Sequence, residues 1–210
     1  MNINMNVDMN VDMNGFLNSY AYYVFLNIPS YILSIKYKKN YYFIQIHKDY
    51  VLMMTYYLYN DLNSKFKQLV DMTCVDYFLK RKRFNIVYNI LSVDFHQRVF
   101  LKFFLSELDS IPSLIYIYPN VSWYEREIWD FFGVYFINNK YMKRIMLDYG
   151  FVGHPFRKDF PLTGFIELAY SYFFSNVIQK KVNLSQMFRK FETNTVWSRI
   201  NSIEENDVNK

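Results

Sequence analysis

The stretch 84-FNIVYNILSVDFHQRVFLKFFLSE-107 carries the clearest strand pattern in the chain. β-Branched and aromatic side chains, which favour extended backbone, dominate residues 84–95 and again residues 98–107. Residues 95–97 make the short turn between these two segments. The pattern therefore predicts a pair of neighbouring strands, and other elements must cover the face that the pair buries.

The residues before this pair predict two helices and a hairpin. Residues 16–28 favour one or two helical turns, and residues 31–38 and 41–47 read as two strands joined by a tight turn. Residues 50–61 have apolar side chains at helical spacing, and Asp49 is the predicted N-cap of that helix.

Residues 65–77 have a mixed pattern that predicts a short strand and a loop. The sequence thus indicates an α+β fold, with a small mixed or antiparallel sheet, helices packed on it, and an extended C-terminal arm.

One later segment fits a helix from cap to cap. Ser122 is the predicted N-cap, and Glu125 three residues on completes a capping box. Arg126 and Asp130 are spaced as i, i+4 partners on the charged face, and Gly133 is the expected C-terminal glycine. We expect this charged face to meet solvent or another protein.

The chain after this helix predicts an arm. Residues 134–137 form a brief strand, after which the periodicity fades, and the segment from residue 134 to residue 173 could reach on the order of 130 Å if extended. Such a length is more natural lying on another protein than inside a domain. The predicted organisation is a disordered low-complexity lead at residues 1–15, an α+β domain at 16–137, and an arm and tail at 138–210.

Composition narrows the class of protein. Aromatic residues make up 21% of the chain while Ala occurs only at Ala21 and Ala169, a pattern typical of an A/T-rich genome. Aromatic content is therefore weak support for a ligand site. Cys74 is the one cysteine, which excludes an internal disulfide and favours a small buried side chain in a reducing compartment. No apolar run is long enough to span a membrane, and no Arg-rich transit peptide is evident.

Known catalytic and cofactor motifs are missing from the sequence. His47, His96 and His154 lie far apart, without a second ligand at metal-binding spacing. There is no glycine-rich phosphate loop and no cysteine cluster for iron and sulfur. A competing class is an RNA-binding organellar protein, because residues 80–83 form a basic run, although such a run is more often a solvated turn.

Two segments carry a resemblance to a known family. They are 122-SWYEREIWDFFGVYF-136 and 143-KRIMLDYGFVGHPFRKDFPLTGF-165, supported by 83-RFNIVYNILS-92 upstream and 186-QMFRKF-191 downstream. They resemble the 30 kDa (subunit 9) family of respiratory complex I, the proton-pumping NADH:ubiquinone oxidoreductase. The resemblance covers residues 30–195. The departures from the family pattern lie at residues 139–142, Phe165 and Ala169.

The resemblance implies a subunit that takes part in the enzyme complex without catalytic residues of its own. It implies that the arm lies along the large subunit of the quinone site, beside other peripheral-arm subunits, on the matrix side of the mitochondrial inner membrane. It further implies indirect membrane contact, no nucleic acid, and no cofactor on this chain, whereas NADH, FMN, iron–sulfur clusters and ubiquinone belong to the whole complex. A bacterial origin is the alternative to a mitochondrially encoded chain.

The glycines, prolines, charges and rings of the second segment suit such an arm. The prolines stiffen it, the charged side chains offer hydrogen bonds, and Phe151, Phe156 and Phe160 offer anchors. The predicted partner-binding residues are Glu125, Arg126, Glu127, Asp130, Arg144, Asp148, Tyr149, His154, Pro155, Arg157, Lys158, Asp159, Phe160 and Pro161.

Overall fold

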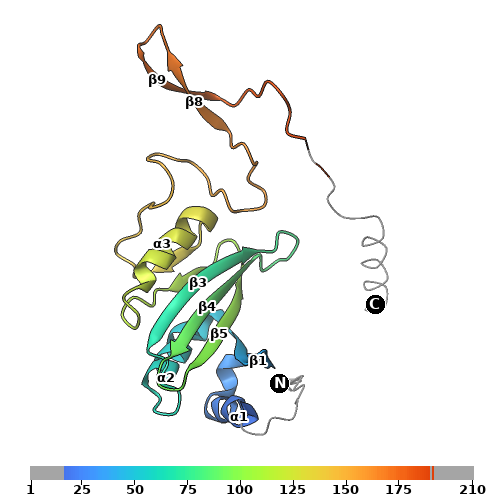
Figure 1. The fold of residues 1–210 in the computed structure, drawn as a ribbon, viewed down its shortest axis with the longest axis vertical. Coiled ribbons are helices and arrows are strands. Elements are labelled where there is room, and N and C mark those ends of the chain that lie inside the picture. Colours follow the sequence, from blue (N-terminus) through green and yellow to red (C-terminus); the bar gives the residue numbers. More distant parts are fainter. Residues whose placement is uncertain (1–16, 190, 192–210) are drawn as a thin grey trace. The chain divides into compact units, whose positions relative to one another are not determined.

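The computed structural model describes residues 17–189 and residue 191 (Figure 1). Contacts divide the chain into two compact units, residues 1–162 and residues 163–210. The predicted lead at residues 1–15 lies outside the described residues.

A five-stranded mixed sheet is the centre of the first unit, in the order β1-β2-β5-β4-β3. Every neighbouring pair is antiparallel except β2 and β5, which are parallel. The hairpin of β1 with β2 and the pairing of β4 with β5 confirm the two predicted strand pairs. The strands are β1 (Ile32–Lys38), β2 (Tyr41–Ile46), β3 (Gln68–Asp76), β4 (Phe84–Ser92) and β5 (Gln97–Leu105).

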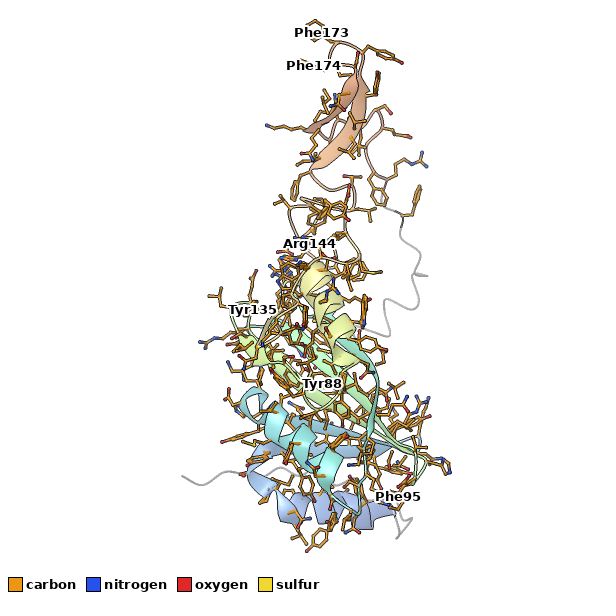
Figure 2. The ribbon with its side chains drawn as sticks, turned by 90° about the vertical axis from the view of Figure 1, so that its left-hand side faces the viewer. Tyr88, Phe95, Tyr135, Arg144, Phe173 and Phe174 are labelled. Carbon is orange, nitrogen blue, oxygen red and sulfur yellow. The ribbon has the colours of Figure 1, made fainter. Side chains whose placement is uncertain are left out.

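The described part of the first unit has three α-helices: α1 (Leu17–Asn27), α2 (Val51–Asn60) and α3 (Val121–Phe132). Their apolar side chains join alternate residues of the strands in one buried core, because successive side chains of a strand point to opposite faces. The predicted α+β class is confirmed. The core includes Val24, Met54 and Leu58 of α1 and α2, Val121 and Ile128 of α3, and Ile86, Tyr88, Leu101 and Phe103 of the central strands (Figure 2 labels Tyr88).

Two local predictions differ from the structure. A short 3-10 turn, η2 (Lys48–Tyr50), precedes α2, so Asp49 lies within that turn and Tyr50 is the N-cap without a side-chain hydrogen bond. β3 has nine residues, more than the short strand expected, because it pairs with β4 from Gln68 to Asp76, with a register shift between Leu69 and Asp71.

The lone cysteine lies in β3 as a core side chain. Cys74 is buried, and burial raises the pKa of its thiol to about 12. At neutral pH the group is a neutral thiol, as expected for a small hydrophobic residue.

A second, smaller sheet lies beside α3. It pairs β6 (Ser110–Pro112) in parallel with β7 (Tyr135–Ile137). The brief strand predicted at residues 134–137 is thereby confirmed, whereas β6 was not predicted.

α1 ends at Asn27, one residue before the predicted end, and a short 3-10 turn, η1 (Pro29–Tyr31), follows it.

In the second unit, the described residues form one antiparallel hairpin, β8 (Ile166–Ser171) with β9 (Asn176–Lys181). This hairpin was not predicted from the sequence, which indicates an arm without regular structure after residue 137. Within residues 163–189, no described residue is buried. None of the helices in the described part of the chain has the length and apolar character to cross a membrane.

Candidate partner interface

Residues 138–162, which we name the clasp segment, were predicted as part of the arm but have their contacts within the first unit. Asp130 near the end of α3 is its first anchor. The fully buried Asp130 carboxylate accepts a hydrogen bond from Arg144 Nη1 at 2.6 Å. The other carboxylate oxygen accepts the backbone N–H groups of residues 145–147 at 3.0–3.2 Å.

These bonds decide the charge of Asp130. Burial would raise the pKa of the carboxyl, but the three backbone donors and Arg144 together hold it below its usual range. The group is therefore ionised at neutral pH. The predicted i, i+4 pair with Arg126 is wrong, because Arg126 instead donates to the backbone oxygen of Lys143 at 3.2 Å.

Glu125 is also fully buried, and the predicted capping box is wrong. α3 begins at Val121, two residues earlier than a Ser122 cap allows, and its N-cap, Asn120, forms no side-chain cap hydrogen bond. The Glu125 carboxylate accepts hydrogen bonds from Ser113 Oγ at 2.7 Å, Asn139 Nδ2 at 2.8 Å and the Leu114 backbone at 2.9 Å. Burial raises the pKa of Glu125 despite these donors. The carboxylate thus ties α3 to the residues that follow β6 and β7.

Gly133 confirms the predicted C-terminal glycine, with a left-handed φ of 78° and an N–H bonded to Trp129 O at 2.9 Å. The ring of His154 and the guanidinium of Arg157 close over this glycine. His154 Nδ1 donates to the backbone oxygen of Asp130 at 3.0 Å, and burial lowers the pKa of the imidazole, which favours its neutral form.

Replacing Gly133 by Ala is expected to lower the free energy of unfolding by about 2 kcal/mol, from left-handed strain plus a clash. An added Cβ would lie 2.6 Å from Arg157 Nη2 and 2.7 Å from the His154 ring. Gly150→Ala is the matched control, since Gly150 has a φ of 70° with nothing within 4 Å of an added Cβ. Chemical denaturation compares the two; equal losses would show that the clasp segment moves aside without cost.

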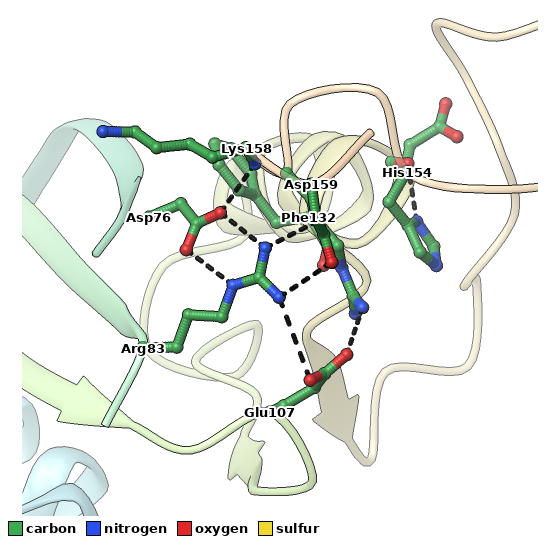
Figure 3. A network of polar contacts seen from close by, with 9 residues as sticks. Asp76, Arg83, Glu107, Phe132, His154, Lys158 and Asp159 are labelled. Atoms are coloured by element: carbon green, nitrogen blue, oxygen red, sulfur yellow. Dashed lines mark hydrogen bonds and ion pairs between the residues drawn. The ribbon is translucent and has the colours of Figure 1, made fainter. Parts of the chain in front are cut away.

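A second anchor joins the clasp segment to the end of the sheet (Figure 3). Arg83 at the start of β4 is buried and forms a bidentate pair with Asp76 of β3, at 2.7 and 2.8 Å. The same guanidinium also donates two hydrogen bonds to the Asp159 carboxylate, from Nη2 at 2.7 Å and from Nη1 at 3.2 Å. The Asp76 carboxylate accepts a further hydrogen bond from the backbone N–H of Lys158 at 2.8 Å. The basic run at residues 80–83 was expected to be a solvated turn, but its last residue, Arg83, is buried.

Arg157 provides a third anchor. Its Nε donates to Phe132 O at 2.6 Å, and its guanidinium pairs with Glu107. The neighbouring Phe156 ring stacks on Phe131 of α3 with ring centroids 4.0 Å apart. Several rings and charges predicted to meet a partner are thus engaged within the chain itself.

Other predicted site residues remain exposed on the clasp segment. Tyr149 is wholly exposed, and Asp148 and Lys158 also face solvent. Partner contact by any predicted residue remains a prediction, and these three side chains have the access it needs. Sequence reasoning missed Asp76 and Glu107; the basic run ahead of β4 was the one signal that carboxylates should lie nearby.

No metal site is evident in residues 17–189 and 191. No group of three or more His, Cys, Asp or Glu side chains in this part of the chain is close enough to hold an ion. The buried acids instead bind arginines, amides and backbone N–H groups. This chemistry fixes segments of the chain in place.

The described residues thus form an α+β unit with the clasp segment fixed on it, followed by a hairpin without buried side chains. A family model described as "Respiratory-chain NADH dehydrogenase, 30 Kd subunit" matches residues 44–166. The chain belongs to this family of complex I-type 30 kDa subunits, which confirms the resemblance seen in the sequence.

Similar proteins agree with this assignment. The NADH-ubiquinone oxidoreductase subunit 9 of Reclinomonas americana is 38% identical over 88% of this chain and 91% of its own length. A protein of the same name from Prototheca wickerhamii is 34% identical over 87% of this chain and 95% of its own. The NADH dehydrogenase [ubiquinone] iron-sulfur protein 3 of Beta trigyna is 38% identical over 74% of this chain and 81% of its own length.

A solved structure shares the fold. The matching chain comes from the membrane-bound sulfane sulfur reductase, described as an archaeal respiratory membrane complex. It is 24% identical, with a TM-score of 0.61 over 69% of this chain and 85% of that chain.

Proposed function

We propose that this chain is a non-catalytic peripheral-arm subunit of proton-pumping NADH:ubiquinone oxidoreductase, which supports the quinone-site module by clamping the neighbouring large subunit with its second unit. The observation that carries the proposal is the hairpin of β8 and β9, in which no side chain is buried. An isolated two-stranded hairpin is marginally stable at best in water, so it needs a surface to lie on.

The hairpin is rich in exposed apolar side chains. Its tip holds Tyr172, Phe173 and Phe174, with Phe173 88% exposed, and Figure 2 labels the two phenylalanines. Exposed apolar residues in such a group mark interaction surfaces, and aromatic side chains often dominate binding energy. The exposed apolar side chains of the strands are Ile166, Leu168, Tyr170, Val177 and Ile178.

The first unit has a different part in this proposal. Its clasp is fixed by Asp130, Arg83 and Arg157, so the exposed Asp148, Tyr149 and Lys158 are presented on an ordered backbone. A surface that is already ordered loses little conformational entropy when it binds.

The proposal extends to cofactors and location. The chain binds no cofactor of its own, and NADH, FMN, iron–sulfur clusters and ubiquinone are bound or used by other subunits of the complex. It functions on the matrix side of the mitochondrial inner membrane and reaches the membrane through its partners. The names of the similar proteins support the assignment to the complex.

Replacing Phe173 and Phe174 together by Ser is expected to reduce incorporation of the chain into the complex about tenfold, since two buried ring anchors would be lost. The denaturation midpoint of the free chain should stay unchanged, because both rings are exposed in it. Incorporation is measured by native separation of detergent-solubilised membranes, with an antibody to the chain and a stain for NADH dehydrogenase activity.

The matched control replaces Val93 and Phe95, which are exposed at the β4–β5 turn, by Ser (Figure 2 labels Phe95). The control should enter the active band as the unaltered chain does. If the unaltered chain migrates apart from the active band, the proposed function is wrong. If the unaltered chain and the Phe173 and Phe174 variant both enter the active band normally, the hairpin tip is not an anchor.

A further inference from the structure

The β3–β4 loop carries a basic run that the clasp uses only in part. Lys80, Arg81 and Lys82 are exposed, and none of them forms an ion pair with another described residue. Arg83 alone turns inward. Three adjacent unpaired cations repel one another, so an anionic partner would relieve that repulsion.

Two of these cations border a cavity of about 320 Å³, which we name the basic pocket. Its lining combines the apolar side chains of Leu33, Ile46 and Phe104 with polar and basic ones, and it includes no acidic residue. Two cation–π contacts position Lys80 beside the pocket. Its ammonium lies 4.8 Å from the centroid of the Tyr77 ring and 5.8 Å from the centroid of the Phe104 ring. The lining residues are Leu33, Gln45, Ile46, His47, Lys48, Lys80, Lys82 and Phe104.

Lys48 and His47 already have acidic neighbours. Lys48 forms an ion pair with Asp109 at 2.6 Å, and His47 lies 3.6 Å from Asp49. The charge available to a ligand in the pocket therefore comes from Lys80 and Lys82. These are flexible ammonium groups suited to carboxylates as well as phosphates.

The pocket continues onto the face of the sheet opposite the core. Gln45, which lines the pocket, is paired in register with Lys102 of β5. On this face Phe43 and Phe100 stack with centroids 5.0 Å apart, and the Lys102 ammonium lies 4.4 Å from the Phe43 centroid. The two rings are thus occupied by each other and by a lysine, so they offer a poor platform for stacking a nucleic-acid base.

The edge of the sheet adds a further feature. β1 is an edge strand, and its Leu33, which lines the pocket, is 53% exposed. Exposed sheet edges accept an extended polypeptide by backbone pairing, with side chains entering pockets beside the edge. The basic pocket is therefore shaped for a carboxylate side chain followed by an apolar one.

We propose that the basic pocket binds an acidic, extended polypeptide segment of another subunit of the complex. Carboxylates of the segment meet Lys80 and Lys82, and an apolar side chain lies between Leu33 and Phe104. The proposal rests on the proposed function, since it takes the partner from the same complex. It adds a second docking surface, formed by the sheet and separate from the hairpin.

The first test uses the purified full chain and fluorescent ten-residue peptides that alternate Glu with Val or Gln with Val. We expect the Glu peptide to bind about tenfold more tightly at low salt, with the difference shrinking as salt rises. Replacing Lys80 and Lys82 by Glu should abolish the preference, whereas replacing Lys39 and Lys140, exposed lysines outside the pocket lining, should preserve it. Equal binding of both peptides, or tighter binding of a ten-residue uridine RNA, would overturn the proposal.

The second test places a photo-crosslinking amino acid at Leu79, which is 96% exposed beside the pocket, within the intact complex. The expected product joins Leu79 to a segment of another subunit rich in Asp and Glu. A product with lipid or RNA, or none at all, overturns the proposal. Absence of the chain from the complex would instead overturn the proposed function, so the two failures can be told apart.

Discussion

Replacing Asp130 by Ala is expected to lower the free energy of unfolding by about 3 kcal/mol, the cost of breaking a buried ion pair. The buried carboxylate accepts hydrogen bonds from the Arg144 guanidinium and three successive backbone N–H groups, and the substitution removes all four. Arg144 keeps the backbone oxygens of Asp130 and Gly153 as acceptors. Because 21% of the Arg144 side chain is exposed, water can partly replace the lost carboxylate. The expected loss of unfolding free energy therefore lies at the lower end of the range for broken buried ion pairs. Urea denaturation of the full chain measures the change.

Glu127→Ala is the matched control for Asp130, because it removes an acid from the same helix. Glu127 is partly exposed and forms no ion pair with a described residue, so its loss should change stability by less than about 0.5 kcal/mol. Hydrogen exchange of the amides at residues 145–147 should accelerate in the Asp130 variant alone. Equal midpoints for the two variants would show that the clasp does not depend on Asp130.

Local patterns in the sequence were sufficient for most of the sheet and the helices. The β-branched and aromatic side chains of residues 84–107 predicted β4 and β5 correctly, because such side chains pack well in strands that bury a face against the core. Gly133 was predicted as the C-terminal glycine because only a residue tolerant of positive φ fits there.

The failures came from contacts between residues distant in the sequence. Glu125 has the spacing of a capping box, yet burial against Ser113 and Asn139 takes its carboxylate away from the helix terminus. Asp130 likewise pairs with Arg144, fourteen residues on, and not with the nearer Arg126. A buried multi-donor site outweighs an exposed i, i+4 pair, which contributes a few tenths of a kcal/mol.

The hairpin of β8 and β9 was missed for another reason. In β8 the apolar side chains of Ile166, Leu168 and Tyr170 alternate over only six residues, and β9 shows no such alternation, so no pair of alternating segments marks the hairpin in the sequence. The contacts of the clasp segment with the first unit were also missed, because they include ion pairs that no local sequence pattern reveals. Asp159 lies 76 residues from Arg83 in the sequence, and only the folded chain brings them together.

Replacing Arg83 by Met is expected to be the most damaging single change, with a loss of about 3–5 kcal/mol in unfolding free energy. Arg83 neutralises Asp76, whose side chain is 1% exposed, and it joins Asp159 to the same site. The variant leaves the Asp76 charge buried with the Lys158 backbone N–H as its remaining donor among the bonds described. Arg81→Met is the control, since Arg81 is exposed in the same loop and should cost less than about 0.5 kcal/mol.

A double variant and a pH series separate the buried charge from lost packing. Adding Asp76→Leu to Arg83→Met should recover most of the loss, because an apolar pair leaves no buried charge without a partner.

In the unaltered chain, burial opposes ionisation of Asp76, but Arg83 and the Lys158 N–H hold its pKa below the usual range. The stability it contributes is present above the unfolded pKa of about 3.9 and is lost as pH falls through the folded value. Without Arg83 the pKa of Asp76 should rise, so the deficit of the single variant should narrow from pH 7 to pH 4. A deficit independent of pH, with no recovery in the double variant, would mean that Arg83 acts through packing on Phe78 and Phe84 instead.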